Sequence, residues 1–102
     1  MKNNHVKKPH TVIVVIEAIK GKEEILKKAL MDVIEPSRSE KSCIEYRLHQ
    51  DKNNSAQFVL YENWESSELH SEQFKKPYII SLGEQFQTLL AKPYQVIFAT
   101  EL

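Results

Sequence analysis

The sequence of 102 residues predicts an α+β fold in which a four-stranded antiparallel sheet carries all of its helices on one face. Three observations support this prediction. Four segments are β-branched or alternate apolar with polar residues, and two longer segments repeat apolar residues at spacings of three and four. These segments also follow one another as strand, helix, strand, strand, helix, strand. This is the order of the ferredoxin-like fold, in which right-handed crossovers place the first and third strands at the centre.

The first strand and helix follow a basic, polar start. Thr11–Ile19 is rich in β-branched residues and apolar on both sides, which is typical of a central strand. Gly21 breaks the pattern. From Lys22 the apolar residues form one helical stripe, and we expect Pro36 to end this helix near Glu35 because proline has no N–H to donate.

The second and third strands form a predicted hairpin. Ile44–Asp51 alternates apolar with charged or polar residues, as an edge strand does. Asn53–Ser55 is typical of a turn, and Gln57–Trp64 is the returning strand.

The last third of the chain supplies two helices and a strand. Ser66 or Ser67 is expected to cap a short helix, and Pro77 to open a longer one at the position where proline fits best. Pro93 stops that helix, and Tyr94–Leu102 is the predicted final strand.

Composition limits the partners. The 14 basic and 14 acidic residues cancel, so we expect neither nucleic acid nor a membrane surface to be bound. The apolar run Val12–Ile16 is too short to cross a bilayer, and two glycines exclude a glycine-rich phosphate loop.

The single Cys43 favours a reducing compartment, the cytoplasm. The four histidines and this cysteine lack metal-ligand spacing, so we expect no metal. Residues 1–10 are expected to be a flexible tail before one domain at 11–102.

The central strands predict a homodimer. With the helices on one face, either Val12, Val14 and Ile16 or Ile13, Val15 and Ile19 must point to the other face. A contiguous apolar patch of several hundred Å² is unusual on a monomer. We therefore expect a second copy to cover this face, sheet against sheet, with two-fold symmetry.

Several segments resemble the antibiotic biosynthesis monooxygenase (ABM) domain, and the resemblance extends over nearly the whole chain after residue 10. They are Val12–Ile19, Gly21–Glu24, Cys43–Tyr46, Phe58–Trp64 and Glu65–Pro77. The resemblance implies a dimeric α/β barrel. The family includes cofactor-independent oxygenases of quinol-like or polyketide aromatics, haem-degrading members, and an isomerase-like branch that acts on a signalling metabolite.

Two positions depart from that pattern. Many members carry a histidine where this chain has Gln73, and a second one where it has Tyr78. The haem-degrading branch places a tryptophan and a histidine on the helices, where this chain offers Gln73 and Gly83. We therefore do not expect haem degradation.

Two residues are the catalytic candidates. His49 is the candidate general base because imidazole titrates near neutral pH, although it lies on the polar side of an edge strand and could be a solvated surface residue. Asn63 could donate a hydrogen bond to an oxyanion, or could cap the following turn. We expect His70 on the short helix to be exposed, although it could instead face the rim of the pocket.

Aromatic side chains are the candidate substrate-binding residues. Tyr46 and Tyr61 share a face, with Asn63 beside them, if the hairpin closes through Asn53 and Asn54, whereas a one-residue change in the loop would reverse this. Aromatic residues that follow would complete the pocket, although core packing also explains them: Trp64, Phe74, Tyr78 and Phe86.

The function predicted from these features is cofactor-independent monooxygenation of a small quinol-like or polyketide-type aromatic. An electron-rich phenol that loses a proton can reduce oxygen itself, so the protein needs an apolar pocket, a base and oxyanion donors. Two alternatives stay open. One is a non-catalytic dimer that binds a small apolar ligand, which the missing family histidines favour. The other is isomerase-type acid–base chemistry on a small carbonyl compound.

Overall fold

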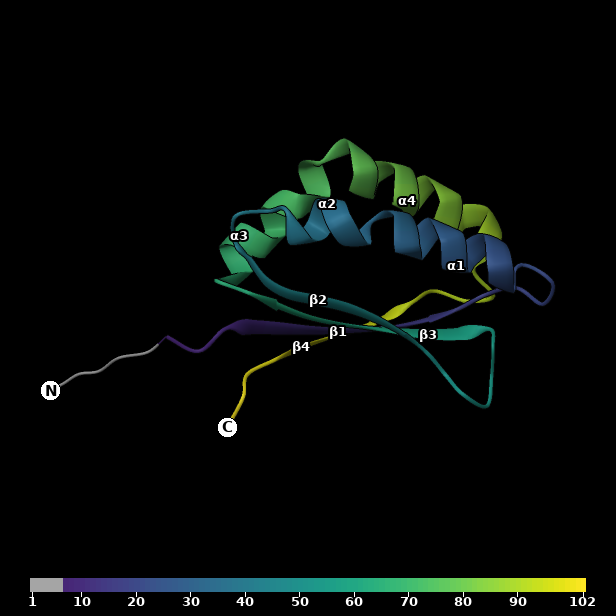
Figure 1. The fold of residues 1–102 in the computed structure, drawn as a ribbon, viewed down its shortest axis with the longest axis horizontal. Helices are drawn as coiled ribbons and strands as arrows, with labels where there is room; N and C mark the ends of the chain where they lie inside the picture. Colours follow the sequence, from purple (N-terminus) through teal and green to yellow (C-terminus); the bar gives the residue numbers. More distant parts are fainter. Residues whose placement is uncertain (1–6) are drawn as a thin grey trace, which may run out of the picture.

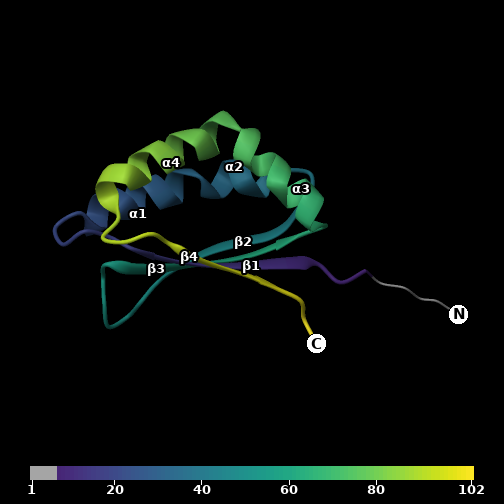
Figure 2. The ribbon, with the colours of Figure 1, turned by 180° about the vertical axis from the view of Figure 1, so that it is seen from behind.

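A computed structural model describes residues 7–102, and within that range four strands form one antiparallel sheet in the order β2–β3–β1–β4 (Figure 1). The central strands β1 and β3 are those that the sequence predicts. The helices all cover one face of the sheet, as two opposite views show (Figures 1 and 2), and the other face is bare. The ferredoxin-like fold is therefore confirmed. The strands are β1 His10–Glu17, β2 Cys43–Gln50, β3 Gln57–Trp64 and β4 Gln95–Ala99.

The helical layer has a long segment from each half of the chain. Ser66 caps α3, because its Oγ accepts a 3.1 Å hydrogen bond from the Leu69 N–H, and Pro77 is the first residue of α4, as predicted. No helix between residues 7 and 102 has the length and apolar content needed to cross a membrane. The helices are α1 Glu23–Asp32, α2 Ile34–Arg38, α3 Ser67–Ser71, the 3₁₀ helix η1 Glu72–Lys75, and α4 Pro77–Leu89.

The first helix ends earlier than predicted, and Pro36 does not end it. The helix is interrupted at Val33, which is both the C-cap of α1 and the N-cap of α2. Pro36 is the third residue of α2 and lies in its first turn, where a backbone N–H would have no partner within the helix. The proline therefore lies in the first turn of a helix rather than ending one.

Three strands have boundaries that differ by one to three residues from the prediction: β1, β2 and β4. β1 begins at His10, which pairs with Trp64 and whose ring lies 5.2 Å from that of Phe98. Residues 1–6 of the expected tail lie outside the described residues. β4 ends at Ala99, because its partner Thr11 is close to the start of β1 and the ladder runs out there.

The core lies between the sheet and the helices. Val12, Val14 and Ile16 point into it, so Ile13 and Val15 lie on the open face. The helical side of the core is formed by buried aliphatic residues of α1 and α4: Leu26, Ala29, Leu30, Leu82 and Leu89.

The hairpin register corrects one prediction. Leu48 pairs with Leu60 and Arg47 with Tyr61, so even-numbered residues of β2 oppose even-numbered residues of β3. Tyr46 therefore faces the helices, whereas Tyr61 lies on the open face, and the two do not share a side. The loop is closed by an Asp51 N–H to Gln57 C=O hydrogen bond of 2.9 Å, and not by a tight turn through two asparagines.

Candidate active site

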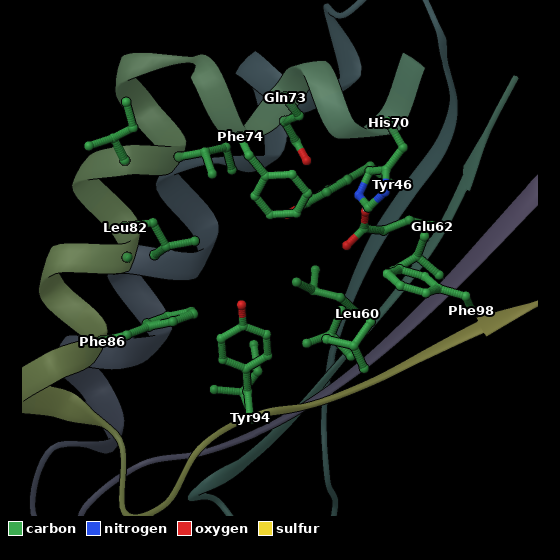
Figure 3. Close-up of a pocket in the computed structure, with 17 residues that line it drawn as sticks. Tyr46, Leu60, Glu62, His70, Gln73, Phe74, Leu82, Phe86, Tyr94 and Phe98 are labelled. Carbon is green, nitrogen blue, oxygen red and sulfur yellow. The ribbon is translucent and has the colours of Figure 1, made fainter. Parts of the chain in front are cut away.

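A cavity of about 500 Å³ lies between the helix-covered face of the sheet and helices α3, η1 and α4 (Figure 3). This volume suits a small organic molecule. Most of its wall is aliphatic or aromatic, and Figure 3 shows these side chains arranged around an open centre. Representative wall residues are Val14, Leu60, Phe74, Leu82, Phe86 and Phe98.

Glu62 places a carboxyl group in this apolar wall. It lies on β3 on the same side as Leu60, and it is almost completely buried. Burial raises the pKa of Glu62 from 4.5 to about 7, because an ionised carboxylate loses its hydration there. A hydrogen bond of 2.8 Å from the Trp64 Nε1 to the Glu62 Oε1 opposes this rise and fixes the carboxyl group. Glu62 is therefore a carboxyl group that can both accept and release a proton near pH 7.

His70 stands next to this carboxyl group. Its Nε2 lies 3.7 Å from Glu62 Oε1, too far for a direct hydrogen bond. The ring is packed among aromatic rings, with centroids 5.0 Å from Trp64 and 5.2 Å from Phe74. Burial lowers the pKa of His70 to about 4, with a smaller effect from His10. The expectation that His70 is exposed is therefore wrong, because α3 turns it inward against the end of β3.

Glu62 and His70 are both neutral between about pH 4 and pH 7. A carboxylate and an imidazolium at this distance would attract each other, but both would lose hydration in the apolar wall. Both pKa values shift in the direction that favours the neutral form, because the loss of hydration outweighs the attraction between the two charges. The arrangement suits proton transfer to and from a ligand better than a permanent ion pair does.

Tyr46 and Gln73 add neutral polar groups to the wall. Burial raises the pKa of Tyr46, so its hydroxyl keeps its proton at neutral pH. The Gln73 Nε2 donates to the Ser37 Oγ at 2.9 Å and to the Tyr78 Oη at 3.3 Å. Figure 3 shows the amide oxygen of Gln73 directed toward the cavity, and the Tyr94 hydroxyl entering it from the opposite end.

Five of the predicted substrate-binding residues lie on the helix side of the sheet, and three of them reach the cavity. Tyr46, Phe74 and Phe86 line it. Trp64 is fully buried behind the wall and holds Glu62, and Tyr78 holds Gln73. The last two contribute by positioning other side chains.

The remaining predicted residues lie on the open face. His49 is exposed opposite Val59, and Tyr61 is 38% exposed. Asn63 is buried in a hydrogen-bond network, because its Oδ1 accepts from the Thr11 Oγ1 at 2.6 Å and its Nδ2 donates to Glu45 at 2.8 Å. The structure therefore brings neither His49 nor Asn63 to the cavity, and their predicted catalytic roles have no support from its geometry.

Sequence reasoning missed Glu62, His70 and Gln73. A signal for Glu62 was present, since it follows Phe58 and Leu60 at intervals of two and so shares their buried face. No comparable pattern marks His70, because the helical turn that carries it is short and changes from α to 3₁₀ just after it. The resemblance marked Gln73 only as the position where many family members carry a histidine. Within residues 7–102, no three His, Cys, Asp or Glu side chains are grouped as metal ligands would be.

The family model described as "Antibiotic biosynthesis monooxygenase" matches residues 9–78. Among curated proteins, the uncharacterised protein sll1783 of Synechocystis is 36% identical over 63 residues. That match covers 62% of this chain and 43% of the longer relative, so less than half of sll1783 is represented.

Solved structures share the fold over almost the whole chain. PA3566 from Pseudomonas aeruginosa is 27% identical with a TM-score of 0.91, and the superposition covers 97% of this chain and 99% of that one. Rv0793 from Mycobacterium tuberculosis is 26% identical with a TM-score of 0.86, covering 92% and 95% of the two chains.

Proposed function

Because the chain belongs to the antibiotic biosynthesis monooxygenase family, we propose that it is a cofactor-independent monooxygenase of a small quinol-like or polyketide-type aromatic. The observation that carries this proposal is the buried Glu62 carboxyl group, with its pKa raised to about 7, in the wall of an otherwise apolar cavity. Such a cavity would hold a flat aromatic ring, and the carboxylate would take the proton of a phenolic hydroxyl.

The raised pKa of Glu62 lies closer to the pKa of a phenolic substrate than the pKa of an ordinary carboxyl group does. A phenol in water has a pKa of about 10, and burial would raise it as it raises that of Tyr46, so transfer of its proton to Glu62 is uphill by at least about three units, or roughly 4 kcal/mol. For a carboxylate with its ordinary pKa of 4.5 the same transfer would cost at least roughly 7.5 kcal/mol. Because the pKa of Glu62 lies near neutral pH, part of the carboxyl groups are ionised there and the base is available.

The substrate supplies the electrons for the oxygen step. The phenolate gives one electron to O₂, and the superoxide and phenoxyl radical formed combine at the ring carbon para to the oxygen. The peroxide anion takes the proton back from Glu62. Loss of water then converts the C–H carbon into a carbonyl, so that a phenol and O₂ become a quinone and water.

Polar groups of the wall would stabilise the negative charge that develops on the substrate. The protonated Tyr46 hydroxyl is a donor of the required kind, and the neutral His70 ring lies beside Glu62. In this proposal the roles predicted for His49 and Asn63 pass to Glu62 and Tyr46, because the latter two line the cavity.

Oxygen consumption tests the proposal. The protein is mixed with a panel of naphthols, anthrols and hydroquinones in an oxygen electrode, and ¹⁸O₂ is used to follow the incorporated atom. We expect uptake above the spontaneous rate for at least one polycyclic phenol, with one ¹⁸O atom in the quinone. Uptake at the spontaneous rate across the whole panel would count against monooxygenation.

The same carboxyl group also favours a second candidate function, isomerase-type chemistry on a small carbonyl compound. A base with a pKa of about 7 in an apolar cavity is suited to removing a proton next to a carbonyl group. Proton NMR in D₂O distinguishes the two, because an isomerase would exchange that C–H proton without consuming oxygen. Binding of these compounds with neither oxygen uptake nor exchange would indicate the non-catalytic ligand-binding dimer.

We also propose that the working unit is a homodimer, with a second copy on the open sheet face. Ile97 pairs with Ile13, which pairs with Tyr61, so one apolar row crosses three strands. Val15 and Val59 form a parallel row beside it. A stable dimer buries about 800 Å² on each partner, which a four-stranded face can supply.

A further inference from the structure

Gln73 is a polar side chain buried in the wall of a mostly apolar cavity, with only 4% of its surface exposed. Both of its hydrogen bonds use the amide nitrogen, which donates to the Ser37 Oγ and the Tyr78 Oη. Within residues 7–102, no protein donor reaches its amide oxygen. A buried acceptor that no protein donor reaches favours a ligand that donates to it.

The orientation of this amide group is fixed by donors and acceptors further from the cavity. Glu40 is a carboxylate paired with Lys76 at 3.3 Å, so it can only accept hydrogen bonds. The Tyr78 hydroxyl donates its proton to the Glu40 Oε2 at 2.8 Å. The Tyr78 oxygen can then only accept, and Gln73 must present its NH₂ group to it. The amide oxygen is therefore the atom left to face the cavity (Figure 3).

We propose that Gln73 makes this cavity selective for aromatic ligands that carry a hydroxyl donor over ligands of the same shape that carry only acceptors. The hydrogen bond between Tyr78 and Glu40 keeps the amide oxygen of Gln73 directed into the cavity. This inference rests on the proposed function only in taking the cavity as the substrate site, since it concerns binding and needs no turnover.

The selectivity has a consequence for the proposed reaction. The hydroxyl of a bound phenol donates to Gln73 until Glu62 removes its proton, and the same oxygen is a carbonyl oxygen in the quinone product. Two oxygen acceptors would then face each other across the binding site, and the product would bind more weakly than the substrate. The same residue would thus favour binding of the reduced compound and release of the oxidised one.

A matched pair of stable probes tests the proposal without catalysis. Isothermal titration in nitrogen-flushed buffer compares 1-naphthol, which can donate, with 1-methoxynaphthalene, which cannot. We expect the wild-type protein to bind 1-naphthol about tenfold more tightly, the effect of one hydrogen bond to a buried acceptor. The preference should vanish in Gln73→Leu and fall to about twofold in Tyr78→Phe, because the amide group can then rotate. Gln85→Leu, at an exposed position of α4, should keep the tenfold preference.

Three results would overturn the proposal. Equal binding of the two probes by the wild-type protein would show that no donor is selected, and a tenfold preference that survives Gln73→Leu would assign the selection to another residue. If the preference survives Gln73→Leu but is lost in Glu62→Gln, this inference fails while the proposed function stands. Absence of binding by both probes would contradict the cavity itself. The ratio of the two dissociation constants is compared between Gln73→Leu and the wild type. This comparison cancels the effect of the extra methyl group of 1-methoxynaphthalene.

Discussion

The indole Nε1 of Trp64 donates a 2.8 Å hydrogen bond to Oε1 of Glu62, two residues earlier on the same face of β3. The period of two that defines a strand places both side chains on the helix side of the sheet. The indole ring is fully buried, so it holds the carboxyl group at the cavity wall and leaves its other oxygen for a ligand. A residue predicted to bind substrate therefore acts by positioning the group that does so.

Glu62→Gln should abolish most of the proposed turnover. The amide has nearly the same shape but cannot take a proton, so kcat should fall at least about 100-fold with KM changed little. Initial rates of oxygen uptake with the best phenol of the panel measure this. Glu65→Gln, three residues further along the chain and exposed, serves as the matched control and should keep wild-type activity. A Glu62→Gln variant with wild-type kcat would remove Glu62 from the mechanism.

The same substitution should change how stability depends on pH. The pKa of Glu62 is about 7 in the folded protein and 4.5 in the unfolded chain. The stabilisation from its neutral form is fully present below pH 4.5 and is lost as the pH rises through 7, because the fold then has to hold a buried charge. Relative to the wild type, Glu62→Gln should therefore gain about 3 kcal/mol of unfolding free energy between pH 4.5 and pH 8.

Urea unfolding followed by circular dichroism at several pH values measures this difference. His70 has a folded pKa of about 4 against 6.5 in the unfolded chain, so its contribution is present above pH 6.5 and is lost as the pH falls through 4. That contribution occurs in both proteins and cancels in the comparison, provided that His70 titrates alike in each. A stability difference that stays constant with pH would show that the pKa of Glu62 is not raised.

Trp64→Phe should shift the pH profile of activity upward. The indole hydrogen bond stabilises the carboxylate and lowers the pKa of Glu62 against the effect of burial. Without the N–H, the pKa should rise, and the pH of half-maximal kcat/KM should increase by about one unit. A purely structural role for Trp64 predicts lower activity at every pH with an unchanged midpoint, so the midpoint separates the two explanations.

Much of the fold could be predicted because each element carries its own local signal. The β-branched run at Val12–Ile16 identified a central strand, and Pro77 marked the start of α4 correctly. Pro36 was misread because its position relative to a helix start decides its effect, and the break at Val33 leaves no mark in the sequence. Boundaries set by a partner strand, such as the end of β4 at Ala99, also need the sheet to be known.

The site was harder to predict than the fold, because it depends on register and on one short helical segment. A shift of one residue in the hairpin decides whether Tyr46 or Tyr61 faces the cavity, and the loop sequence did not fix that shift. His70 reaches Glu62 only through the turn of α3, and the two lie eight positions apart in the sequence. The ordinary pKa of imidazole pointed to His49, and the rule that charged residues lie outside pointed away from Glu62, although a buried carboxyl group is a stronger sign of function than an exposed histidine.

The proposed homodimer can be tested with two isoleucines that are almost equally exposed. Ile97 on the open sheet face is 53% exposed, and Ile25 on α1 is 54% exposed. Ile97→Glu would place a carboxylate from each copy into the interface, where neither has a partner, so sedimentation velocity should show the change from dimer to monomer at micromolar concentration. Ile25→Glu adds the same charge on the outer side of the helical layer and should remain a dimer. A wild-type protein that sediments as a monomer, or an Ile97→Glu variant that stays dimeric, would mean that the apolar rows across the sheet are not the contact between copies.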